Sequence, residues 1–90
     1  MKRFYVIISG RVTGVSFRYF VKNNANMLNV KGWVRNTIDG KLEAVFEGKD
    51  YLVDELIKLC RKGPNTARVD KLELKEEKYK GEFNSFNIVY

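Results

Sequence analysis

The chain has 90 residues, enough for one folded domain and too few for a second. It contains one cysteine and no histidine, which excludes an internal disulfide, a cysteine metal cluster and a histidine general base. Lys and Arg outnumber Asp and Glu by 17 to 11, and the net charge of +6 favours anionic ligands without choosing among nucleic acids, acidic proteins and phosphorylated metabolites. The basic residues are spread evenly along the sequence, which favours a solvated surface over a nucleic-acid footprint.

No apolar run is long enough to span a membrane, and no signal-peptide pattern precedes the first strand-like residues. We therefore expect a cytoplasmic protein with no membrane partner. Residues 1–90 contain no linker, repeat or low-complexity segment, so we expect a single domain over this range. Nothing in the sequence indicates more than a monomer.

The first part of the chain predicts a strand followed by a helix. Residues 4–8 are apolar at both alternating positions, as in an inner strand that is covered on both faces. Apolar residues then recur at helical spacing from Phe17 onward, which predicts a helix. Asn29 is a plausible left-handed residue just beyond the end of that helix.

The middle of the chain predicts a β-hairpin. Residues 32–37 and 42–48 are the two strands, and the Asp-Gly pair within residues 38–41 is typical of a type I′ turn. In the second strand the apolar residues alternate with Glu43 and Glu47. This alternation predicts one buried face and one polar face.

The last part predicts a second helix and two strands. Asp50 is a candidate N-cap, and an apolar stripe that includes Cys60 continues to Gly63-Pro64, which ends the helix. Residues 69–74 predict a strand with a change of parity that indicates a bulge, and residues 86–90 alternate as a final strand. The order β-α-β-β-α-β-β is that of a ferredoxin-like α/β sandwich, with an antiparallel sheet and both helices on one face.

The turn between the first strand and the first helix is the strongest candidate site. It reads GRVTGVSFR at 10–18, with two glycines that allow successive backbone N–H groups to point into one concavity. Arg18 adds a guanidinium at the start of a helix, and both features suit a phosphoryl group. In the simpler interpretation Gly10 and Gly14 make only a strand-to-helix turn.

A second polar cluster, Arg35-Asn36-Thr37, closes the next strand and can approach the first turn if the two strands lie close together. Each of its members also has an ordinary structural interpretation, because asparagine and threonine near a strand end often satisfy turn backbone. Trp33 is better explained by packing, and Cys60 by its place as a small apolar residue.

The chain resembles the acylphosphatase family over almost its whole length. The resemblance rests on GRVTGVSFR at 10–18, GWVRNT at 32–37, LEAVFEG at 42–48 and FNIVY at 86–90, of which the first two are specific in combination. It implies the ferredoxin-like fold and hydrolysis of carboxyl–phosphate anhydrides to a carboxylate and inorganic phosphate. It also implies that the reaction needs no metal or cofactor.

By position, the resemblance implies that Arg18 binds the phosphoryl group and that Asn36 orients the attacking water. Thr37 follows the asparagine as in many relatives and is a candidate supporting residue. Thr13 stands where glutamine is frequent in the family, and Asn29 where glycine is frequent. The implied phosphate-binding loop consists of the backbone amides of Gly14, Val15, Ser16, Phe17 and Arg18.

The implied chemistry agrees with the residues present. A carboxylate leaves without being protonated, so the absence of a histidine acid is no obstacle. The main alternative is a basic ferredoxin-like module that binds nucleic acid or phosphate without catalysis. RNA-recognition domains of this topology need exposed aromatic residues, and the third strand offers only Phe46, at a position expected to face the core. We therefore expect small acyl phosphates as partners and no nucleic acid.

Overall fold

The structure, a computed structural model, describes residues 1–90, and its elements follow the predicted order. Neither helix is long and apolar enough to cross a membrane. The elements are β1 (Lys2–Arg11), α1 (Phe17–Met27), β2 (Lys31–Asn36), β3 (Leu42–Gly48), α2 (Asp50–Lys62), β4 (Arg68–Glu77) and β5 (Phe86–Ile88).

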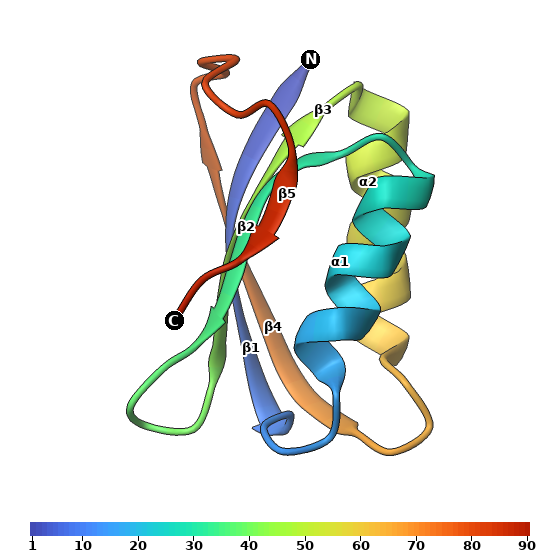
Figure 1. The fold of residues 1–90 in the computed structure, drawn as a ribbon, viewed down its shortest axis with the longest axis vertical. Helices are drawn as coiled ribbons and strands as arrows, with labels where there is room; N and C mark the ends of the chain where they lie inside the picture. The colour runs from blue at the N-terminus through green and yellow to red at the C-terminus, as the bar shows by residue number, and fades with distance from the viewer.

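The five strands form one sheet in the order β4-β1-β3-β2-β5 (Figure 1). The pairs β1–β4, β1–β3 and β2–β3 are antiparallel, as predicted. β5 is parallel to β2, so the sheet is mixed and not wholly antiparallel. The cause lies in the connection between β4 and β5. The chain turns back after β4, so β5 runs opposite to β4 and therefore in the same direction as β2.

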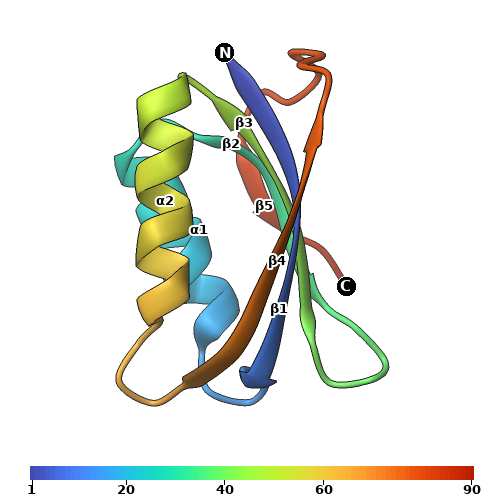
Figure 2. The ribbon, with the colours of Figure 1, turned by 180° about the vertical axis from the view of Figure 1, so that it is seen from behind.

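Both helices cover the same face of the sheet, as Figures 1 and 2 show from opposite sides. The prediction that β1 is covered on both faces is wrong. Val6 and Ile8 are buried beneath the helices, whereas Tyr5 and Ile7 are half-buried on the face that the helices leave open. The core beneath the helices consists of Val6, Ile8, Val12, Phe17, Val21, Ala25, Val30, Val34, Leu42, Ala44, Phe46, Val53, Leu56, Ile57, Cys60 and Phe86.

The hairpin between β2 and β3 is present, but its turn is not type I′. A type I′ turn needs positive φ at both central residues, and only Gly40, with φ of 81°, has it. The loop instead spans residues 37–41, closed by the amide of Thr37 donating to the carbonyl of Lys41 at 2.8 Å. The Thr37 hydroxyl donates to Asp39 and accepts from the amide of Lys41, which stabilises this longer loop.

The helix ends agree with the sequence except at the start of α2. Lys49 is the N-cap there, and Asp50 is already helical. The Asp50 carboxylate pairs with the N-terminal ammonium group at 2.9 Å and does not cap the helix. Asn29 has the predicted left-handed conformation with φ of 55°. Gly63 ends α2 as predicted. The predicted bulge is present where the register between β1 and β4 shifts after Ser9.

The prediction that Glu47 lies on an exposed polar face of β3 is wrong, because Glu47 is only 2% exposed. Its carboxylate accepts hydrogen bonds from the Arg3 guanidinium at 3.2 Å and from the amides of Lys80 and Gly81 at 2.9 and 3.2 Å. Burial alone would raise the pKa of Glu47, but these hydrogen bonds outweigh burial and lower it. Glu47 therefore attaches the segment after β4 to the open face of the sheet.

Candidate active site

The turn from β1 to α1 has an unusual backbone. Gly14 has φ of 70°, and Ser16, a residue with a side chain, also lies in the left-handed region with φ of 61°. A Cβ atom placed on Gly14 would meet no heavy atom within 4 Å. Conformation, and not lack of space, therefore favours glycine at position 14, and the space above it is open.

This backbone leaves a row of hydrogen-bond donors free. The amides of residues 15–19 donate no hydrogen bond within the protein. Residues 17–19 form the first turn of α1, where N–H groups have no partner inside the helix. The loop is attached from outside by Thr66, whose hydroxyl donates to the carbonyl of Val15 at 2.9 Å. Free amides at a helix N-terminus are suited to an anion.

A cavity of about 220 Å³ lies at this loop and brings Arg18 and Asn36 together. Asn36 follows Val34 by two positions on β2 and so shares the face of the sheet that α1 covers. Arg18 lies in the first turn of α1, directly after the loop. The lining residues are Val12, Gly14, Ser16, Phe17, Arg18, Tyr19 and Asn36.

Three other sequence candidates lie elsewhere. Val15 does not line this cavity, and its carbonyl is the acceptor for Thr66. The Thr37 hydroxyl is occupied within the hairpin loop. Arg35 lies on the opposite face of the sheet, where its guanidinium donates to Glu43. Arg35 therefore adds no charge to the cavity lining.

Tyr90 is a neighbour of the site that the sequence did not indicate. Its ring lies 5.0 Å from the guanidinium carbon of Arg18, a cation–π contact. The contact arises because the amide of Val89 donates to the carbonyl of Val34 and so holds the end of the chain beside β2. No local pattern could reveal this, since the two residues are 72 positions apart in the sequence (90 − 18).

A second cavity of about 540 Å³ adjoins the first and shares Gly14 and Ser16 with it. Its other lining residues, Arg11, Val15, Asn65 and Thr66, come from the end of β1, the loop and the connection between α2 and β4. Sequence reasoning missed Arg11, Asn65 and Thr66, although Arg11 falls within the glycine-containing motif. No carboxylate lines either cavity, so both are open to anions.

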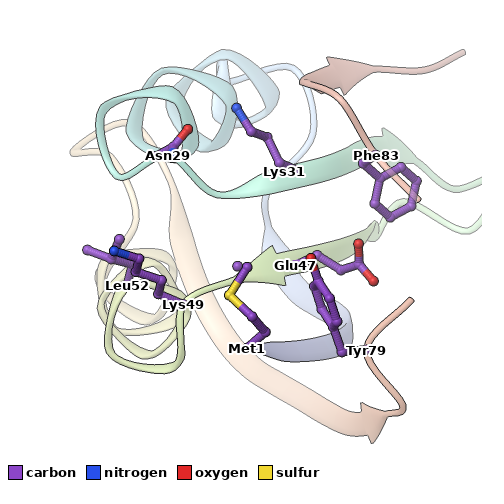
Figure 3. A pocket seen from close by; sticks show the side chains of 9 residues that line it. Met1, Asn29, Lys31, Glu47, Lys49, Leu52, Tyr79 and Phe83 are labelled. Carbon is purple, nitrogen blue, oxygen red and sulfur yellow. The ribbon is translucent and has the colours of Figure 1, made fainter. Parts of the chain in front are cut away.

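A third cavity of about 230 Å³ lies where β3 joins α2 (Figure 3). Figure 1 shows that this junction is at the end of the molecule opposite the turn from β1 to α1. Figure 3 shows Lys31 from β2, Leu52 from α2 and Tyr79 from the segment after β4 around this cavity. It contains none of the predicted site residues. Its buried carboxylate, Glu47, already accepts hydrogen bonds from Arg3 and from two backbone amides.

The lone cysteine does not belong to any of these cavities. Cys60 is fully buried among the apolar residues of the core, and burial raises the pKa of its thiol to about 12. At neutral pH it stays a thiol and packs as a small apolar residue, as the sequence predicts.

Comparison with known proteins identifies the family of this chain. The family model described as Acylphosphatase matches residues 4–88. The acylphosphatase of Syntrophus aciditrophicus is 48% identical over 90 residues, covering all of this chain and 94% of that protein. The crystal structure of acylphosphatase from Bacillus subtilis superposes with a TM-score of 0.96 at 32% identity and full coverage of both chains. That of an acylphosphatase from Coxiella burnetii gives 0.92 at 30% identity, covering 98% of this chain and 92% of that one. The chain belongs to the acylphosphatase family.

Proposed function

We propose that this protein hydrolyses the carboxyl–phosphate anhydride bond of small acyl phosphates, releasing a carboxylate and inorganic phosphate. The observation that supports this most is that Arg18 and Asn36 line one cavity, beside a loop whose amides are free. Membership of a family whose relatives are named acylphosphatases supports the same reaction.

Arg18 and the amides of the Gly14–Arg18 loop bind the phosphoryl oxygens. The guanidinium supplies one full positive charge and paired donors, which match the geometry of a phosphoryl group. The amides add donors that are already oriented, so little reorganisation is needed as charge shifts during the reaction. Together they stabilise the negative charge on the transferring group.

Asn36 orients the attacking water. Its side-chain carbonyl accepts from the water while its NH₂ group can donate, which fixes the direction of attack. The water oxygen bonds to phosphorus, the bond from phosphorus to the acyl oxygen breaks, and the carboxylate leaves with the electron pair. A proton of the water passes to a phosphoryl oxygen, so no side chain has to act as general base.

The first test is release of inorganic phosphate from acetyl phosphate in the presence of EDTA. We expect the wild-type protein to be active under these conditions, because arginine and backbone amides take the role that a metal ion would otherwise have. Arg18→Ala should reduce turnover by at least about 10³-fold, since it removes the one charged group of the cavity. Arg61→Ala, on the exposed surface of α2, is the control and should keep full activity. Wild-type inactivity, or an Arg18→Ala variant as active as the control, would contradict the proposal.

The proposed partners are small acyl phosphates and phosphate, and we propose a cytoplasmic monomer that does not bind nucleic acid. Phe46, the aromatic residue of β3, is buried against Phe86 and cannot stack on a base. A gel-shift with single-stranded RNA at moderate salt and sedimentation velocity of the protein test these two points.

A further inference from the structure

We propose that the second cavity, beside Arg11 and Asn65, binds the acyl tail of the substrate and favours tails that carry a carboxylate. This inference rests on the proposed function and adds a substrate class to it. The first cavity holds groups suited to the phosphoryl end of an acyl phosphate, and the second holds different groups.

The two cavities border the same loop. Both are lined by Gly14 and Ser16. Gly14 has no side chain, and the position that its Cβ would occupy has no heavy atom within 4 Å. In the proposed binding mode one molecule extends from Arg18 past Gly14 into the second cavity, with the scissile bond between the two ends.

The second cavity contains a cation that the protein leaves without a partner. Arg11 is exposed and forms no ion pair, whereas Arg68, directly opposite it on β4, is paired with Asp70 at 2.9 Å. Directly opposed residues of neighbouring strands project to the same face, and like charges placed in this way repel. An anion beside Arg11 reduces this repulsion.

A neutral side chain of the cavity, Asn65, can donate a further hydrogen bond to an anion. The Asn65 side chain makes no hydrogen bond within the protein, and its NH₂ group can donate to a carboxylate oxygen. The Thr66 hydroxyl already donates to Val15, so Thr66 holds the loop and offers no donor to the tail. No carboxylate lines the cavity to repel a negative tail.

The test compares two rigid substrates of nearly equal shape, 4-carboxybenzoyl phosphate and its neutral analogue 4-carbamoylbenzoyl phosphate. Neither can cyclise onto its own anhydride, because the ring holds the two groups apart. We expect wild-type kcat/KM for the carboxylate to exceed that for the amide by about fivefold at low ionic strength, the upper range for a partly exposed charge pair. The ratio should decrease as salt is added, because screening weakens the pair.

Arg11→Gln should reduce the ratio to about one, and Asn65→Ala should lower it by a smaller factor. Lys75→Gln removes the same charge from the exposed middle of β4 and should leave the wild-type ratio intact. A ratio near one in the wild type, or a ratio that Arg11→Gln leaves unchanged, would overturn this inference. Failure of the proposed function gives a different result, since the wild type would then hydrolyse neither substrate nor acetyl phosphate.

Discussion

Arg18 and Asn36 differ in what each can offer to an anionic substrate. Arg18 is half-buried, its guanidinium lies against the Tyr90 ring, and it lines the cavity beside the loop with the free amides. Asn36 is exposed at the end of a strand and carries no charge. Affinity for phosphate and speed of hydrolysis should therefore depend on different residues.

We expect Asn36→Ala to reduce kcat for acetyl phosphate by about 10²–10³-fold, as removal of one oriented polar group does in other hydrolytic sites. Competitive inhibition by inorganic phosphate should stay at the wild-type level, because Asn36 acts on the water. Steady-state kinetics with phosphate as inhibitor measure both quantities. Asn23→Ala, on the exposed side of α1, is the matched control. Weaker phosphate inhibition in Asn36→Ala would show that Asn36 binds the phosphoryl group instead.

At the scale of elements, the position of Asn36 depends on how closely β2 approaches β3. Gly32, near the start of β2, has φ of 140°, and a Cβ there would lie 1.8 Å from the carbonyl oxygen of Val45 on β3. Any side chain at position 32 would force the two strands apart. The pairing that places Asn36 opposite Leu42 therefore requires glycine at position 32.

Gly32→Ala should lower the free energy of unfolding by about 3 kcal/mol or more, because backbone strain and a clash with the neighbouring strand add together. Gly40→Ala is a matched control, since Gly40 also has positive φ but open space around it. It should cost only about 1–2 kcal/mol, the strain of a left-handed residue. Urea denaturation of both variants measures the difference, and equal values would show that the close approach contributes nothing.

At the scale of the whole molecule, the open face of the sheet is held to the last part of the chain by a buried charge cluster. The Arg3 guanidinium donates to Glu47, Glu77 and Glu82, which come from three separate segments. Burial lowers the pKa of Arg3, but the three carboxylates outweigh burial and raise it. The cluster connects β1, β3 and β4 to the segment that leads into β5, and β5 in turn places Tyr90 beside Arg18.

Glu47→Ala should lower the free energy of unfolding by about 3 kcal/mol, because it leaves part of a buried guanidinium and two amides without an acceptor. Urea denaturation measures this cost. Glu55→Ala, on the exposed surface of α2, should change stability by no more than about 0.5 kcal/mol. Equal costs for the two variants would show that the cluster does not stabilise the fold.

The same cluster predicts how stability depends on pH. The pKa of Glu47 is lower in the folded protein than its ordinary value of 4.5, so the stabilisation is complete above pH 4.5 and decreases as pH falls through the folded value. The pKa of Glu43 is also lowered, chiefly by the hydrogen bond from the Tyr5 hydroxyl. Protonation of Glu43 at low pH therefore also lowers the stability of the folded protein. Urea titrations at several pH values below 6 should show unfolding at progressively lower denaturant. Glu47→Gln should weaken the dependence of the free energy of unfolding on pH. An unchanged dependence would show that Glu47 does not cause it.

The sequence alone determined the order of the elements, the helix ends at Asn29 and Gly63, and the bulge in β4. These features depend on residues close together in the chain, where turn conformations and apolar periodicity operate. Only the tertiary structure decided the parallel pairing of β5, the burial of Glu47 and the cavity at Arg11 and Asn65. Each of these joins segments far apart in sequence, and local patterns contain no information about which segments meet. Glu47 illustrates the reason: its alternation with apolar residues predicts exposure, whereas a segment more than thirty positions later covers it.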